Sequence, residues 1–318
     1  MSKLNFSLTQ LEYVLAVYRH GHFAKAAEAC FVTQPTLSMQ IQKLEESLGI
    51  TIFDRSKKPI LLTDMGKELV ETMQTVLEES KKIESIIQSR STGELEGDLN
   101  VGIIPTLAPY LLPLLLPVLE KRFPNVQLRV KELQTSRIIE MLQQDEIDVG
   151  ILAIPLKIPK ILETPLYFEP FSILCKKGHE IGKQKKIDYS SLKFDDIWLL
   201  EEGHCLRHQV LDVCSIKQKK GVKKRVQFES GSLETLKNLV NSFGGYTLLP
   251  YLATESRGQN TMLVEFERPI PSRQIGLVRR REHHKTEMIQ ALGDCILSAI
   301  PEELKQLQQK NLDVLKVE

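Results

Sequence analysis

Residues 23–49 read FAKAAEACFVTQPTLSMQIQKLEESLG, and this stretch decides the fold of the first part of the chain. The small residues at its start predict a helix that packs closely against a neighbour. Thr33, Gln34 and Pro35 then combine a polar cap with proline in a first turn, and both features begin helices. The next helix has one apolar face and ends at Gly49. That face consists of Leu37, Ile41, Leu44 and Leu48.

The segments on either side extend this pattern. Apolar residues at helical spacing predict a helix over residues 8–18, and residues 51–62 indicate two short strands around a basic turn. Thr63 and Asp64 then cap a helix whose apolar stripe continues for more than twenty residues. A stripe of this length with charged flanks is typical of a coiled-coil seam, so we expect the helix to pair two subunits. The alternative is a contact with the remainder of the same chain.

The chain changes character after a polar, glycine-containing hinge at residues 89–97. Strand and helix patterns then alternate, which is typical of parallel sheets with crossover helices, and the length suits two lobes with a cleft between them. Strands are expected at residues 99–104, 126–133, 149–153, 171–175, 197–200, 226–228, 246–249 and 275–279. Helices are expected at residues 111–123 and 136–144.

Composition sets the broad class of the protein. The 318 residues are 42% hydrophobic and 26% charged, which suits two or three soluble domains. No apolar run approaches the ~20 residues that span a bilayer, and the first residues have no hydrophobic signal core, so we expect a cytoplasmic protein without a membrane partner. Five scattered cysteines in a reducing compartment indicate free thiols or a redox device. Cys30, Cys175 and Cys295 fall within apolar segments and are expected to act as small hydrophobic residues.

The helix that opens with Gln34 has the features of a DNA-recognition helix. Polar side chains at its amino-terminal end can reach base edges in the major groove, and the basic turn that follows can contact phosphates, as a wing does. The expected DNA-binding residues are Gln34, Pro35, Thr36, Ser38, Gln40, Lys43, Arg55 and Lys57. A three-helix structural domain is the alternative, and net charge of +1 does not distinguish the two.

Two cysteines, Cys205 and Cys214, lie nine positions apart. Cys205 has His204 and Arg207 beside it, and nearby positive charge lowers the pKa that controls the thiolate fraction of a cysteine. A helix over residues 205–214 would hold the two Cα atoms roughly 13 Å apart. A disulfide needs about 4.4–6.8 Å, so the pair could close only if such a helix unwound.

Redox chemistry has two alternatives at this pair of cysteines. The spacing could be coincidental, and His204, Cys205, His208 and Cys214 could together bind zinc. The usual paired-ligand spacing of a zinc site is missing, so neither a metal nor a cofactor is expected.

Five short motifs lie close together in the first part of the chain: residues 23–28 (FAKAAE), 33–38 (TQPTLS), 41–45 (IQKLE), 53–55 (FDR) and 62–66 (LTDMG). Together they resemble the LysR-type transcriptional regulators. The resemblance implies an α plus α/β fold: a winged helix-turn-helix at residues 1–66 and a linker helix with its hinge at 63–92. An effector domain of two α/β lobes, like those of periplasmic binding proteins, would follow at residues 93–305, with a tail at 306–318. Lobe I would cover about 93–167 and 268–300, and lobe II about 168–267. Family members usually act as homodimers or homotetramers on pseudo-palindromic double-stranded DNA.

The second half resembles the peroxide-sensing branch of that family, through residues 104–106, 109–113, 132–135 and 203–207 with Cys214. This resemblance implies that Cys205 is the peroxidatic thiol and Cys214 the resolving thiol. Thr106, Thr135 and His204 would line a pocket for hydrogen peroxide. Arg207, two residues from Cys205, is expected to belong to the same pocket and to raise the thiolate fraction. His208 stands where members usually have an acidic residue.

The implied function is activation of antioxidant genes, with the disulfide reduced again by a thiol reductant such as glutaredoxin or thioredoxin. The chain would then be a regulator and not an enzyme. Two further functions stay open. A thiol peroxidase would turn over many times, whereas a sensor reacts about once per subunit. A LysR-type regulator that responds to a small metabolite between its lobes would ignore peroxide.

Overall fold

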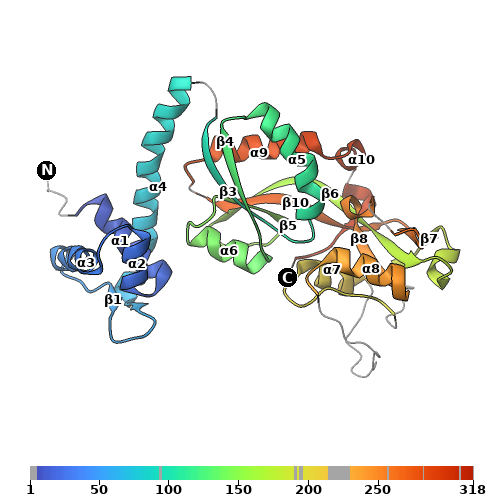
Figure 1. The fold of residues 1–318 in the computed structure, drawn as a ribbon, viewed down its shortest axis with the longest axis horizontal. Helices are drawn as coiled ribbons and strands as arrows, with labels where there is room; N and C mark the ends of the chain where they lie inside the picture. The colour runs from blue at the N-terminus through green and yellow to red at the C-terminus, as the bar shows by residue number, and fades with distance from the viewer. Residues whose placement is uncertain are drawn as a thin grey trace. The chain divides into compact units, whose positions relative to one another are not determined.

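The computed structural model describes residues 6–92, 95–189, 192, 196–213, 230–255, 258–281, 283–307 and 309–317 (Figure 1). The chain divides into two compact units. The amino-terminal unit comprises residues 1–93 with 282–285, and the carboxyl-terminal unit comprises residues 94–281 with 286–318.

The amino-terminal unit has the helices and the two short strands expected from the sequence. Its elements are α1 (Leu8–His20), α2 (Phe23–Ala29), α3 (Gln34–Leu48), β1 (Phe53–Asp54), β2 (Leu61–Leu62) and α4 (Asp64–Thr92). The Thr33 hydroxyl accepts from the Thr36 amide, and Gly49 ends α3 with a φ of 68°, which confirms both predicted caps. The Thr63 hydroxyl accepts from the Gly66 amide at 3.0 Å and so caps α4.

One buried carboxylate joins α3 to the strand pair. Glu45 on α3 is 8% exposed and accepts hydrogen bonds from the Ile52 amide at 2.7 Å and the Phe53 amide at 3.3 Å. Its other oxygen lies 2.8 Å from the Arg55 guanidinium. Because three donors converge on this carboxylate, the position of β1 is fixed relative to α3.

The carboxyl-terminal unit is built on a mixed sheet in the order β4-β3-β5-β10-β6-β9-β7, with β11 beside β10 and β8 beside β6. The strands are β3 (Gly97–Ile103), β4 (Val126–Glu132), β5 (Val149–Ile154), β6 (Ile161–Lys176), β7 (Lys186–Ile187), β8 (Tyr246–Pro250), β9 (Thr261–Phe266), β10 (Ile270–Arg280) and β11 (Leu312–Val314).

Strand direction corrects the expectation of parallel sheets. β3 pairs in parallel with β4 and β5, but β10 is antiparallel to β5 and β6, and β6 is antiparallel to β8 and β9. The reason is that the chain passes from one lobe to the other on β6 and returns on β10, so these neighbours run in opposite directions. Of the remaining expected strands, residues 197–200 form only an isolated bridge at Ile197, and residues 226–228 lie outside the described residues.

Helices cover the sheet and divide the unit into two hydrophobic cores. In Figure 1, α5 (Ala108–Arg122) and α9 (Thr286–Ala299) lie on one face of the first part of the sheet, and α6 (Thr135–Gln143) lies on the other. This core defines lobe I. A second core, under α7 (Cys205–Val213) and α8 (Leu233–Phe243), defines lobe II. The shorter helices are η1 (Glu180–Lys183), η3 (Tyr251–Thr254), α10 (Glu302–Lys305) and η4 (Gln309–Asn311).

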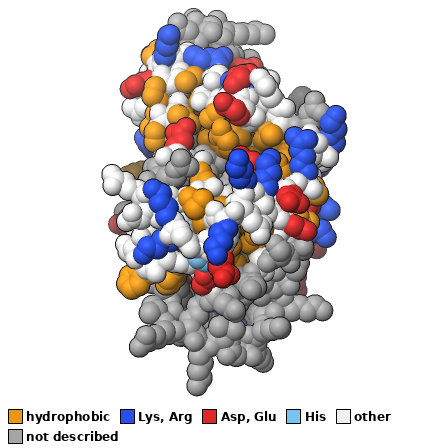
Figure 2. Space-filling view, turned by 90° about the vertical axis from the view of Figure 1, so that its right-hand side faces the viewer, with side chains coloured by type: hydrophobic (Ala, Val, Ile, Leu, Met, Phe, Trp, Pro, Cys, Tyr) orange, Lys and Arg blue, Asp and Glu red, His pale blue; other side chains and the backbone are white. Residues whose placement is uncertain are grey.

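On the face of the carboxyl-terminal unit seen in Figure 2, basic and acidic side chains are interspersed. A helix must be long and apolar to cross a membrane, and none within the described ranges meets both conditions.

A buried ion pair joins the two strands that connect the lobes. Arg273 on β10 lies opposite Glu169 on β6, and its Nε and Nη2 atoms are 2.8 and 2.7 Å from Glu169 Oε2. Glu169 Oε1 accepts from the Leu252 amide at 2.9 Å, and Arg273 Nη1 donates to the Thr106 hydroxyl at 2.8 Å. Both charged side chains are at most 1% exposed. These hydrogen bonds offset the cost of removing two charges from water.

Replacing Glu169 by Gln keeps the shape of the side chain and leaves Arg273 buried without a counter-charge. We expect the free energy of unfolding of the carboxyl-terminal unit to fall by about 3–5 kcal/mol. Urea titration followed by fluorescence of Trp198, the chain's single tryptophan, measures this change. The double variant Glu169→Gln, Arg273→Met should recover most of the loss. A single variant within about 1 kcal/mol of wild type would contradict this role of the pair.

Candidate functional site

Cys205 lies where two helices from different lobes meet. It is the first residue of α7, and Thr135 is the first residue of α6. The Cys205 Sγ atom lies 3.1 Å from the Thr135 hydroxyl oxygen, and Cys205 is 8% exposed. The positive end of a helix dipole stabilises a thiolate, and here two helix amino termini lie at one thiol. The position therefore suits a sulfur atom that acquires negative charge.

Opposing effects act on the protonation of this thiol. Burial raises the pKa of Cys205, whereas the hydrogen bond with Thr135 and the charge of Arg273 act to lower it. Burial has the largest effect, so the pKa of Cys205 lies above the ordinary value. The sequence expectation of a lowered pKa is not met in this conformation.

The residues flanking Cys205 point to different partners. His204 is 5% exposed, and its Nε2 atom lies 3.6 Å from Glu201 Oε1. Arg207 instead donates from Nη1 to the Leu200 carbonyl at 2.6 Å. Gly203 has a φ of 90°, and a Cβ there would lie 2.8 Å from Gln134 Oε1, so glycine permits this close approach of the lobes. Cys214, the expected resolving thiol, lies outside the described residues.

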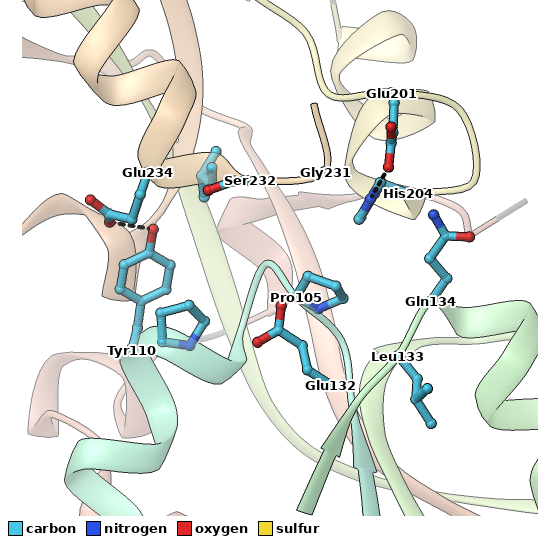
Figure 3. A pocket seen from close by; sticks show the side chains of 12 residues that line it. Pro105, Tyr110, Glu132, Leu133, Gln134, Glu201, His204, Gly231, Ser232 and Glu234 are labelled. Atoms are coloured by element: carbon cyan, nitrogen blue, oxygen red, sulfur yellow. Dashed lines mark hydrogen bonds and ion pairs between the residues drawn. The ribbon is translucent and has the colours of Figure 1, made fainter. Parts of the chain in front are cut away.

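A cavity of about 290 Å³ opens between the lobes next to His204 (Figure 3). At its edge, Tyr110 of lobe I donates a hydrogen bond to Glu234 on α8 of lobe II at 2.7 Å. Lys237 lies 2.6 Å from the same carboxylate and 5.3 Å from the centre of the Tyr110 ring. The lining residues are Pro105, Pro109, Tyr110, Glu132, Leu133 and Gln134 from lobe I and Glu201, His204, Gly231, Ser232, Leu233 and Glu234 from lobe II.

Sequence reasoning missed two polar residues of this site. Arg273 is the cation that acts on Cys205 and also binds Thr106, which is 3% exposed. Gln209 is fully buried on the turn of α7 after Cys205, and its amide atoms have no hydrogen-bond partner within the described residues. A charge inside an apolar strand could have revealed Arg273, and the four-residue spacing from Cys205 could have revealed Gln209. Within the described ranges, no three or more His, Cys, Asp or Glu side chains are grouped so that they could hold a metal ion.

The expected DNA-binding residues divide into exposed side chains and side chains already held by the fold. Gln34, Pro35, Thr36 and Lys43 on α3 and Lys57 in the following turn are exposed, whereas Ser38 is half-buried. Gln40 is half-buried too, and its Oε1 atom accepts from Gln10 on α1 at 3.2 Å. Arg55 binds Glu45 and lies 5.2 Å from the centre of the Phe23 ring. The freely presented polar surface is thus the amino-terminal end of α3 and the turn after β1.

Known proteins resemble both units. Residues 8–67 match the family described as bacterial regulatory helix-turn-helix protein, lysR family, and residues 92–301 match the LysR substrate binding domain. A hydrogen peroxide-inducible genes activator of Haemophilus influenzae is 34% identical over 312 residues, covering 98% of this chain and 100% of its own length.

Two solved structures resemble the chain over nearly its whole length. A full-length OxyR of Pseudomonas aeruginosa with a cysteine-to-aspartate change has a TM-score of 0.76 and 34% identity, covering 93% of this chain and 99% of its own. A Corynebacterium glutamicum OxyR cysteine-to-serine mutant bound to hydrogen peroxide has a TM-score of 0.62 and 28% identity, covering 98% and 100%.

These matches agree with the fold and with the site. The helix-turn-helix match covers α1 to β2, and the substrate-binding match covers both lobes and the joint at Cys205. The curated relative is more than 30% identical and aligns over its whole length. The chain therefore belongs to the LysR family of bacterial helix-turn-helix transcriptional regulators, in the group whose members are named OxyR.

Proposed function

We propose that this protein senses hydrogen peroxide through a thiol-disulfide change between Cys205 and Cys214 and thereby activates antioxidant genes. The observation that carries the proposal is the setting of Cys205, whose sulfur lies 3.1 Å from the Thr135 hydroxyl at the meeting point of α6 and α7. The relatives named as peroxide-inducible activators, and an OxyR bound to hydrogen peroxide, support the same signal.

The reaction needs a cysteine, a peroxide and a second thiol. The Cys205 thiolate attacks one oxygen of hydrogen peroxide, the O–O bond breaks, and the departing hydroxide takes a proton to become water. The resulting sulfenic acid condenses with the Cys214 thiol, which forms the disulfide and releases a second water. Two thiols and one peroxide therefore give one disulfide and two waters.

The residues around Cys205 supply what this reaction requires. Thr106 accepts a hydrogen bond from Arg273, so the hydrogen of its own hydroxyl is left for a peroxide oxygen. Arg273 places positive charge near the sulfur. This charge stabilises the negative charge that moves from the sulfur to the leaving oxygen during the attack. The buried amide of Gln209 offers a donor and an acceptor without partners in the described residues, on the same face of α7 as Cys205. His204 adds a polar group at the adjoining cavity.

Helix α7 makes the disulfide a conformational signal. Its nine residues place the first and last Cα atoms about 12 Å apart. Cys214 follows directly on Val213, and a disulfide brings two Cα atoms to about 4.4–6.8 Å, so α7 has to unwind for the bond to form. Unwinding removes Cys205 from Thr135 and with it a contact between the lobes. Loss of this contact would allow the two lobes to repack against each other.

The output of the proposed switch is DNA binding. Helix α4 would pair two subunits, two pairs would assemble as a tetramer, and α3 of each subunit would enter the major groove of a pseudo-palindromic operator. A thiol reductant such as glutaredoxin or thioredoxin would reset the disulfide. Because DNA and reductant are both needed, the proposed compartment is the cytoplasm. The chain would turn over once per reduction cycle and would not serve as a peroxidase.

A small metabolite is the second candidate signal, and the cavity between the lobes favours it. The cavity is about 290 Å³ and has carboxylates from Glu132, Glu201 and Glu234 in its wall. A metabolite regulator would change its DNA contacts when a ligand fills this cavity and would not respond to peroxide. Thiol labelling and footprinting of cysteine variants distinguish the two signals.

Peroxide should oxidise Cys205 before any other cysteine. In the variant Cys214→Ser the sulfenic acid has no resolving thiol, so micromolar peroxide followed by a sulfenic-acid-specific label and mass spectrometry should find the label at Cys205. Cys175 and Cys295 are buried and have no such setting, and they serve as internal controls. Label at those residues or at Cys30 instead would refute the assignment of Cys205.

Replacing Thr135 by Val keeps the shape and removes the hydroxyl that lowers the pKa of Cys205. We expect the second-order rate of oxidation at neutral pH to fall about 10- to 100-fold, because the thiolate and the developing charge both lose a donor. The rate should still rise with pH, since the pKa of Cys205 is raised, and its midpoint should move to higher pH. Stopped-flow measurements across pH give both quantities. Thr135→Ser keeps the hydroxyl and should show the wild-type dependence of the oxidation rate on pH. An unchanged oxidation rate in Thr135→Val would show that Thr135 has only a structural role.

Oxidation should change the position or length of the DNA footprint, because repacked lobes alter the distance between paired recognition helices. Footprints of wild-type protein with reductant and with peroxide, compared with Cys205→Ser, measure this directly. The variant should give the reduced footprint under both conditions. Identical wild-type footprints in the two redox states would show that the protein responds to some other signal.

A further inference from the structure

Phe31, in the turn between α2 and α3, has an unusual backbone conformation and an unusually exposed side chain. Its backbone is left-handed, with a φ of 55°, and its side chain is 97% exposed. The Phe31 amide donates to the Glu28 carbonyl at 3.1 Å, and the Val32 amide donates to the Ala27 carbonyl at 3.0 Å. This pair of hydrogen bonds is the Schellman motif that ends a helix, with Phe31 at the position where glycine is most common.

A phenylalanine at this position does not stabilise the folded unit. A left-handed backbone is unfavourable for a residue with a Cβ, and glycine or asparagine would adopt it more easily. A ring that stays 97% exposed removes almost no apolar surface from water. The next residue, Val32, makes the apolar contact with the core of the unit. The ring of Phe31 is therefore suited to a partner outside the folded unit.

The neighbourhood of Phe31 indicates what that partner is. Phe31 lies two residues before Thr33, the cap of α3, and so flanks the end of the helix that presents Gln34 and Thr36. On α3 itself, Pro35 is exposed and Met39, one turn later, is 48% exposed. Apolar side chains thus accompany the polar ones at this end. Among the base edges of the major groove, the apolar group is the 5-methyl group of thymine.

We propose that Phe31 is a specificity-determining residue whose ring contacts the 5-methyl group of a thymine at the edge of the half-site read by α3. The proposal rests on the entry of α3 into the major groove. It assigns to Phe31 a preference for thymine over uracil or cytosine at one position in each half-site. The contact is apolar and involves no phosphate, so it changes base preference and leaves the salt dependence of binding unaltered.

The test uses full-length protein and a duplex that the wild type enriches from a randomised library. Deoxyuridine replaces each thymine of that duplex in turn, which removes one methyl group and changes nothing else. At one position per half-site we expect wild-type affinity to fall about threefold to tenfold, as loss of a buried methyl contact implies. Phe31→Gly should bind the thymine duplex about tenfold more weakly and should not distinguish thymine from uracil at that position.

Matched variants separate binding from folding. Phe31→Gly and Phe31→Asn both suit the left-handed backbone, so their melting temperatures should equal or exceed that of the wild type while their affinities fall. Phe31→Leu keeps an apolar side chain and should still distinguish thymine from uracil. Gln34→Ala reports on α3 independently of Phe31. If Gln34→Ala weakens binding while Phe31→Gly does not, the inference fails and α3 remains the reading helix. A loss in Phe31→Gly that is equal on thymine and uracil duplexes also overturns the methyl contact.

Discussion

The buried ion pair between Glu169 and Arg273 is the interaction on which the carboxyl-terminal unit depends. It joins β6 and β10, the two strands that carry the chain between the lobes, at the register position where they lie side by side. Two charges in such a place are tolerated because each binds the other and a further polar group: the Leu252 amide donates to Glu169, and Arg273 donates to the Thr106 hydroxyl. Removing either charge would strand the other in the interior. The same arginine therefore joins the two strands that connect the lobes and places positive charge near Cys205.

In the proposed sensor, that arrangement would restrain the reactivity of Cys205. A thiol that is 8% exposed is costly to ionise, and its pKa rises accordingly. Arg273 and the amino termini of α6 and α7 supply positive potential without exposing the sulfur to solvent. If Cys205 is the sensing thiol, as proposed, such a site would favour a small uncharged oxidant that fits a confined space lined by hydrogen-bond donors. A larger oxidant could react with the same thiol but would not reach the buried sulfur as easily.

Sequence patterns predicted local structure well and long-range relations poorly. The caps at Thr33, Thr63 and Gly49 were found because capping depends on a few adjacent residues. The direction of β6 and β10 was missed, since alternating strands and helices do not record that a chain leaves a lobe and returns to it. Arg273 was missed for the same reason, because its partners Glu169 and Thr106 are more than a hundred residues away. Arg207 is close to Cys205 in sequence, but in the structure its guanidinium binds the Leu200 carbonyl.

The shortness of α7 has a consequence for how much oxidant the proposed sensor can survive. A sulfenic acid that waits too long can be attacked by a second peroxide and become a sulfinic acid, which ordinary thiol reductants do not repair. A helix of nine residues has little stability of its own and is held mainly by its packing. The frequency with which α7 opens therefore sets the lifetime of the vulnerable intermediate. A longer or better-capped helix would lengthen that lifetime and make irreversible damage begin at a lower dose.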